Sequence, residues 1–167
     1  LMKAGEDSES DMSYMLGDTV TIEGIVTMPT GLSYAGSGIK FIFADVNGGP
    51  WSALLSYDPD SSAFPTLFEG DLIQATGYVY EYTTGPANMT ELFITEPINI
   101  IDFEQPLPVV DTVQTGDLRW PTEAEQWGNV MVRVEEAVVT GNDFQYEVFA
   151  ADDGSGSVLV DDDSDSI

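Results

Sequence analysis

Apolar and polar side chains alternate along the first part of the chain with the two-residue period of β-strands. In the clearest stretch Val20, Ile22 and Val26 alternate with threonines, and a Gly-Asp pair typical of turns precedes them. The pattern predicts five strands, at residues 20–28, 41–44, 51–57, 72–82 and 91–101, with an irregular crossing at 61–68. The predicted fold class is therefore all-β.

Two stretches begin alike and carry a glycine at the same place. Gly-Asp pairs at 17–18 and 70–71 each open a predicted strand, and Gly24 and Gly77 follow at equal spacing. A glycine inside a strand marks a bend, which a strand needs when its halves pair with different neighbours in a small closed barrel. Bent first and fourth strands predict a five-stranded OB-like barrel, and a β-sandwich is the alternative.

A second, partial copy of this pattern follows. Residues 128–134 repeat the opening of the first strand, although Glu135 stands where the bending glycine would be. Residues 146–151, the turn at 152–156 and residues 157–160 repeat the second strand, its turn and the third strand. The architecture we expect is therefore a tandem of five-stranded OB-like barrels whose second copy is incomplete.

These patterns divide the chain into four parts. Three prolines between the two copies predict an extended linker, with a helical turn at 122–127. The parts are a flexible N-terminal segment at 1–16, an OB-like domain at 17–103, a Pro-containing linker at 104–127 and a partial OB-like domain at 128–167.

The second copy lacks the pattern of a fourth and a fifth strand, because only residues 161–167 follow its third strand. An open three-stranded remnant would expose apolar surface and unpaired strand edges, which proteins avoid. We expect it to be completed either by the rest of a longer chain or by strands from a neighbouring copy. The second route would generate a filament, because such a head-to-tail contact does not close.

Composition narrows the function. The 167 residues include 30 Asp and Glu against 4 Lys and Arg, for a net charge of −26, and neither His nor Cys is present. Without imidazoles and thiols most common catalytic apparatus is absent, so we expect no enzyme. The charge disfavours nucleic-acid binding, and the absence of a long apolar run argues against membrane insertion. Self-repulsion on this scale favours an extracellular or cell-surface medium containing salt, with an acidic cytosolic protein as the alternative.

The second copy, NVMVRVEEAVVTGNDFQYEVFAADDGSGSVLV at 129–160, resembles OB-like repeats of secreted and surface proteins of bacteria. Such repeats accompany extracellular nucleases and type IX-sorted proteins. The first copy, from GDTVTIEGIVT to GDLIQATGYVYEY, is similar to the same family. The resemblance implies an accessory module, and it transfers no activity.

One candidate site is an acidic cluster near the second copy's Gly-Ser turn. Its carboxylates suit Ca²⁺, which prefers oxygen ligands, although no complete EF-hand spacing is present. A solvated acidic tail is the alternative. The candidate metal ligands are Asp152, Asp153, Asp161, Asp162 and Asp163.

A second candidate site is aromatic. Tyr78, Tyr80 and Tyr82 share one face of the predicted fourth strand. Trp51 and Tyr57 belong to the predicted third strand. Aromatic side chains on an OB surface stack on sugar rings or bases, whereas packing against the rest of the chain is the alternative. Separately, Asn88 opens an Asn-Met-Thr sequon, the acceptor for N-glycosylation.

From these features we expect a non-enzymatic extracellular structural or assembly module, completed by a neighbouring copy or by a longer chain. The alternative is a saccharide- or ligand-binding accessory domain of a secreted hydrolase or nuclease. The expected partners are a second copy, the rest of a longer chain or a saccharide. Ca²⁺ is the one cofactor that the acidic cluster suggests.

Overall fold

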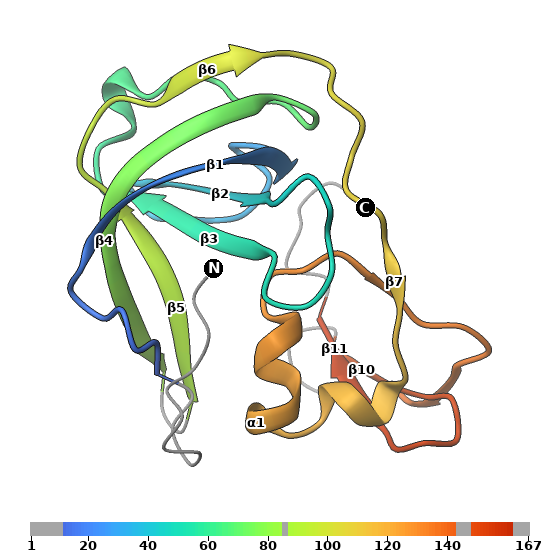
Figure 1. Cartoon of the computed structure of the whole chain (residues 1–167). Helices are drawn as coiled ribbons and strands as arrows, with labels where there is room; N and C mark the ends of the chain where they lie inside the picture. The colour runs from blue at the N-terminus through green and yellow to red at the C-terminus, as the bar shows by residue number, and fades with distance from the viewer. Residues whose placement is uncertain (1–11, 85–86, 143–147, 162–167) are drawn as a thin grey trace.

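The computed structural model describes residues 12–84, 87–142 and 148–161. Its largest sheet curls into a barrel in the N-terminal part of the chain (Figure 1). The strands of this sheet are β1 (Thr19–Met28), β2 (Ile39–Ala44), β3 (Ala53–Asp58), β4 (Leu72–Thr84), β5 (Ala87–Ile94) and β6 (Asn99–Asp102).

The strand order identifies the barrel. Neighbouring strands run in the order β1-β2-β3-β5-β4-β6. An additional pairing of β1 with β4 closes a ring of five strands, and β6 pairs with the first residues of β4. The β3–β5 pair is parallel, and the other pairs are antiparallel. A five-stranded Greek-key barrel of this kind is the OB-fold, so the predicted fold class is confirmed.

The two predicted bends lie where β1 and β4 change partners. Residues of β1 up to Ile25 pair with β4, and those from Ile25 onward pair with β2. A Cβ atom at Gly24 would lie 2.6 Å from the carbonyl oxygen of Ala44. A Cβ atom at Gly77 would overlap the backbone oxygen of Phe93, on the strand that β4 joins there. Glycine is therefore required at both places by close backbone approach.

The inward side chains of the strands form the core of the barrel. Phe41 and Phe43 stack at 6.0 Å between ring centroids, and Val26, Ile73 and Leu92 surround them. The predicted crossing contains the short helix η1 (Ser61–Ala63) and contributes Leu67, which is fully buried. The crossing therefore closes one side of the core.

The last predicted strand, at 91–101, is two strands in the structure. β5 begins earlier, at Ala87, and β6 resumes only at Asn99. Pro97 lies in the interruption and has no N–H to donate to a ladder. Both strands nevertheless pair with β4.

Part of the predicted flexible segment at 1–16 contacts the barrel, while residues 1–11 lie outside the described residues. Ser13 is 5% exposed, and its backbone N–H donates to Oε1 of Glu81 at 2.7 Å. The hydroxyl of Thr90 donates to the same oxygen at 2.8 Å. A carboxylate buried inside the barrel thus anchors the chain before β1.

The remaining elements form what we call the C-terminal unit, residues 111–161. It contains a three-stranded sheet in the order β11-β10-β9 and a parallel β7–β8 pair. Its elements are β7 (Asp111–Thr112), η2 (Thr115–Leu118), α1 (Pro121–Ala124), η3 (Glu125–Trp127), β8 (Val132–Arg133), β9 (Val138–Gly141), β10 (Phe149–Asp152) and β11 (Val158–Val160).

The C-terminal unit corrects two expectations about segment structure. The predicted linker at 104–127 is not an extended spacer, because it supplies β7, the three short helices and the buried Thr115. The strand expected at 128–134 is reduced to β8, and the unpredicted β9 follows it. Between the two, Glu136 has a φ of 57°, which ends extended pairing.

The repeat remains visible in one hairpin of each copy. Oδ1 of Asp45, directly after β2, accepts a hydrogen bond from the N–H of Asn47 at 2.9 Å. Oδ1 of Asp152, at the end of β10, accepts from the N–H of Gly154 at 2.7 Å. The same Asx turn therefore joins the second and third strands of both copies.

We predict that Gly77→Ala lowers the free energy of unfolding by about 3 kcal/mol, because the added Cβ forces the β4 and β5 backbones apart. Gly17→Ala is the matched control. It has open space around a φ of 85°, so it costs only the left-handed conformation, about 1 kcal/mol. Urea unfolding measures both, and equal losses would contradict the steric explanation.

Candidate functional site

The outward face of the barrel carries a concave site of about 490 Å³, which we call the tyrosine groove. It lies over β2, β3, β4 and β5 and is bordered by the loop between β1 and β2. The lining residues are Tyr34, Ala35, Gly36, Lys40, Tyr57, Tyr78, Tyr80, Tyr82, Glu91 and Phe93.

Strand alternation places the tyrosines of β4 in this groove. Val79 is fully buried in the core, so Tyr78, Tyr80 and Tyr82 point to the opposite face. Tyr80 is 41% exposed and Tyr82 46% exposed, and loop residue Tyr34 is 84% exposed. The groove thus presents large aromatic surfaces to solvent.

Phe93 holds the aromatic floor of the groove together. Its ring stacks on Tyr78 at 4.8 Å between centroids and meets the edge of Tyr57 at 5.8 Å. Tyr80 packs edge-on against Tyr78 at 6.4 Å. Because each ring is supported by a neighbour, the floor is a pre-formed surface.

Two ionisable side chains lie among the aromatic ones. Glu91 is 4% exposed, and this burial raises the pKa of its carboxyl. The positive charge of Lys40 partly offsets the rise in pKa, and the negative charge of Glu81 increases it. Lys40 is the one basic residue lining the groove. A ligand here would meet a hydrogen-bonding acceptor and a donor on a mainly aromatic surface.

The structure brings together three of the four predicted ligand-binding residues. Tyr57, Tyr78 and Tyr80 line the groove, but Trp51 does not. Trp51 precedes β3, its φ of 64° turns the chain, and its side chain lines a different pocket. Its assignment to the third strand was therefore wrong, because the strand begins at Ala53.

Of the remaining lining residues, the sequence placed Tyr82 on the same face as Tyr78 and Tyr80, and it missed the others. Glu91 and Phe93 alternate with buried Leu92 on β5, so the strand period could have identified them. Tyr34 has no such signal, because it belongs to a loop whose path depends on the finished barrel. Lys40 is far from the tyrosines in sequence and reaches them through the β2–β3 pairing.

The glycosylation candidate Asn88 lies on β5 rather than in a loop. Its Oδ1 accepts a hydrogen bond from the hydroxyl of Thr83 at 2.7 Å. The sequon's third residue, Thr90, is buried and donates to Glu81. Glycosylation at Asn88 stays a prediction, and in the folded barrel the sequon hydroxyl is already engaged.

In the described part of the acidic cluster the carboxylates serve the fold. Asp152 caps its own turn, and Oδ1 of Asp153 accepts from the hydroxyl of Thr115 at 2.8 Å. Within residues 12–84, 87–142 and 148–161 no group of three or more Asp or Glu side chains is arranged to hold a metal ion. Asp161 follows β11, while Asp162 and Asp163 lie outside the described residues. Calcium binding stays a prediction.

Asp153 joins the former linker to the β10–β11 turn. The hydroxyl and backbone N–H of Ser155 hold the pKa of the Asp153 carboxyl well below its usual range, and Thr115 adds to this effect. Both oxygens of the carboxylate accept hydrogen bonds from Thr115. The two segments, far apart in sequence, are therefore connected through a charged acceptor.

The chain was also compared with known proteins. No family model and no curated protein matches it. Among solved structures, the OBody NL8 bound to hen egg-white lysozyme is 22% identical over 52% of this chain and 96% of its own, with a TM-score of 0.38. The OBody AM1L10, also bound to lysozyme, is 21% identical over 60% of this chain and 95% of its own, with a TM-score of 0.40.

An aspartyl tRNA synthetase from Entamoeba histolytica is 18% identical over 64% of this chain, with a TM-score of 0.43. The match spans 23% of the synthetase. The OB-fold of the barrel is defined by its strand order and closure. Among the described residues, no helix has the length and apolarity needed to cross a membrane.

We predict that Asp153→Asn destabilises the C-terminal unit at neutral pH, because the variant loses the charged acceptor between Thr115 and Ser155. The pKa of Asp153 is lowered on folding, so its contribution is present above the unfolded pKa of about 4 and is lost as pH falls below it. The difference between wild type and variant should therefore be constant above about pH 5 and shrink below about pH 4.

Urea unfolding followed by tryptophan fluorescence, to which Trp120 and Trp127 of the C-terminal unit contribute, measures this difference at a series of pH values. Glu69→Gln removes the same charge from an exposed turn and serves as the control. A wild-type advantage over Asp153→Asn that persists unchanged at about pH 2 would show that the charge of Asp153 is not responsible.

Proposed function

We propose that this chain is a non-enzymatic binding module of the extracellular space, and that its tyrosine groove binds a neutral saccharide chain. The observation that carries the proposal is the pre-formed aromatic floor, centred on Phe93, with Tyr34, Tyr80 and Tyr82 exposed above it.

Aromatic side chains and saccharides have complementary surfaces. One face of a sugar ring is lined by C–H groups and packs flat on an aromatic ring, while its hydroxyls need donors and acceptors at the edge. In the groove, Lys40 supplies a donor and the tyrosine hydroxyls supply both donors and acceptors, while the nearly buried Glu91 carboxylate is an acceptor within the floor. Apolar floor and polar edges thus occur together.

Charge limits the ligand to neutral or basic molecules. The net charge of −26 repels polyanions, and a single lysine in the groove cannot neutralise a run of phosphates or uronates. The same self-repulsion supports an extracellular setting that contains salt or divalent cations. Among uncharged ligands, a saccharide makes the best use of the exposed tyrosine rings.

We predict that Tyr80→Ala weakens saccharide binding about tenfold or more, because it removes one exposed stacking surface. Tyr80→Phe, which keeps the ring, should retain most of the affinity. Tyr14→Ala is the matched control, since Tyr14 is an exposed tyrosine outside the groove.

The measurement is binding to immobilised β-glucan, α-glucan and chitin oligosaccharides, with polygalacturonate as an acidic comparison, followed by calorimetry with the strongest binder. Equal loss in Tyr80→Ala and Tyr14→Ala, or preferential binding of polygalacturonate, would count against the proposal.

A second candidate function, a structural or assembly module, is favoured by the C-terminal unit. Its β11-β10-β9 sheet leaves one edge of β9 and one edge of β11 without a strand partner among the described residues. Val138 and Val139 are each 62% exposed, and Leu159 is 61% exposed. Strand addition from a second copy would pair an edge and cover this apolar surface.

If the module assembles in this way, self-association should increase with salt, because screening reduces repulsion between acidic copies. Leu159→Lys should suppress the association, and Val46→Lys, which places the same charge at an exposed valine of the barrel turn, should not. Sedimentation velocity and electron microscopy of the purified chain provide the readout. A monomer at all salt concentrations would eliminate this function.

A further inference from the structure

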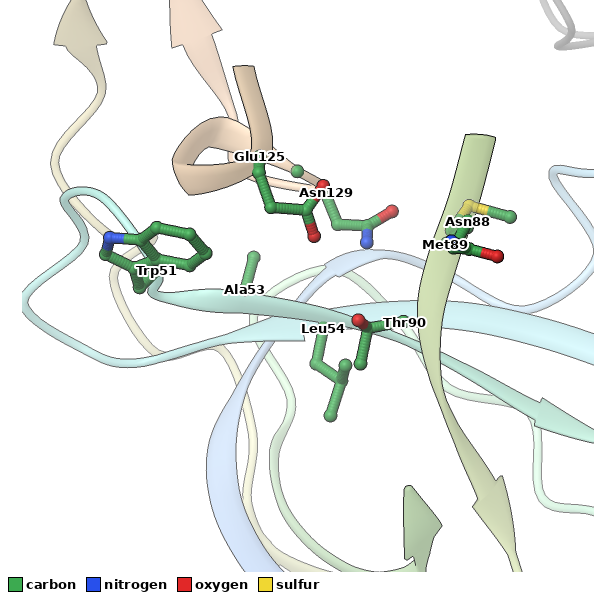
Figure 2. A pocket seen from close by; sticks show the side chains of 9 residues that line it. Trp51, Ala53, Leu54, Asn88, Met89, Thr90, Glu125 and Asn129 are labelled. Carbon is green, nitrogen blue, oxygen red and sulfur yellow. The ribbon is translucent and has the colours of Figure 1, made fainter. Parts of the chain in front are cut away.

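A second pocket, of about 230 Å³, lies between the barrel and the C-terminal unit, and we call it the Trp51 pocket. Figure 2 shows Trp51, Glu125 and Asn129 above β3, on the side to which Ala53 points, while Leu54 points away. On the β5 side, Asn88 and Met89 complete the wall. Both parts of the chain therefore build the pocket.

The backbone around this pocket holds two unusual conformations. Trp51 has a φ of 64° and Asn129 a φ of 61°, and both line the pocket. Left-handed conformations of residues other than glycine persist only where the surrounding structure imposes them. Here the N–H of Trp51 donates to the carbonyl of Gln126 at 2.6 Å, which ties the barrel to η3 and sets the position of the indole ring.

The Trp51 pocket and the tyrosine groove adjoin one another. Tyr82 of the groove pairs directly with Met89 of the pocket in the β4–β5 ladder. The next outward residue of β5 after Met89 is Glu91, which lines the groove. Along β3, Ala53 and Tyr57 lie at the two sites, about 13 Å apart at ~3.3 Å per residue. The two sites thus follow each other along one face of the β3–β5 pair.

We infer that the Trp51 pocket is a second saccharide subsite, and that the ligand is an extended chain of several sugar units running from the tyrosine groove to the C-terminal unit. The inference rests on the proposed function of the groove. In this arrangement the indole of Trp51 stacks on one sugar ring, and the Asn129 amide exchanges hydrogen bonds with the hydroxyls of that ring.

Binding should consequently depend on chain length. A disaccharide reaches only one site, whereas a hexasaccharide spans the tyrosine groove and the Trp51 pocket together. Joining the two contacts in one ligand raises affinity without any change in either site. The C-terminal unit is then part of the binding surface and not only an appendage of the barrel.

The test measures affinities by calorimetry for disaccharide and hexasaccharide pairs: cellobiose with cellohexaose, laminaribiose with laminarihexaose, maltose with maltohexaose, and chitobiose with chitohexaose. We expect Trp51→Ala to weaken hexasaccharide binding about tenfold and to leave disaccharide binding unchanged. Tyr80→Ala should weaken both.

Asn129→Gly is the second variant. It removes the amide while glycine adopts the positive φ without strain, so the fold is preserved even if Trp51→Ala unfolds. Asn129→Gly should also reduce the affinity for the hexasaccharide and leave the affinity for the disaccharide unchanged. Because Trp51 lies in the site, the hexasaccharide should change the intrinsic fluorescence of the wild type, and Trp51→Phe should abolish that change.

The outcomes separate the two proposals. The second subsite is refuted if the hexasaccharide and the disaccharide bind with equal affinity. It is also refuted if Trp51→Ala and Asn129→Gly change the affinity for neither saccharide, or change it equally for the two. In either case the tyrosine groove is judged separately, by the Tyr80→Ala result. If no saccharide of the set binds the wild type, the proposed function fails and the extended site fails with it.

Discussion

Closure of the sheet by the β1–β4 pairing is the constraint on which the rest of the structure depends. Two strands must each serve two partners, and this is possible only because backbones approach closely at Gly24 and Gly77. Closure leaves the β3–β5 pair to join in parallel, with Tyr57 beside Phe93. That pairing, together with the β4–β5 ladder, brings side chains from three strands into one aromatic surface. The candidate site is thus a direct product of how the barrel closes.

The abundant carboxylates have different roles in different places. Glu81 is buried and anchors the chain before β1, whereas Asp153 joins the former linker to a hairpin through hydrogen bonds. Glu91 lies buried in the tyrosine groove, with Lys40 partly balancing it. The remaining negative charge disfavours polyanions. In the proposed saccharide site, aromatic stacking would therefore supply most of the affinity.

The C-terminal unit combines one hairpin turn repeated from the barrel with a different strand arrangement. Its hairpin repeats the Asx turn of the barrel, yet its first strand is divided at Glu136 and its open sheet exposes valines and a leucine. At the same time η3 and the turn that follows it place Glu125 and Asn129 over β3 (Figure 2). The unit therefore contributes to the candidate binding surface, and among the described residues the outer edges of its β9 and β11 have no strand partner.

The amino-acid sequence alone determined the all-β class, the OB-like barrel and the outward tyrosines of β4, because strand period and bending glycines are local signals. It also located the repeated turn after β2 and β10. Tertiary structure decided the rest. Trp51 left the predicted strand because its N–H bonds to Gln126, a residue of the C-terminal unit. The predicted linker is structured because the hydroxyl of Thr115 donates a hydrogen bond to Asp153, 38 residues away in sequence. Lys40 joined the tyrosines through strand pairing and Tyr34 through the path of a loop, and no local pattern encodes either.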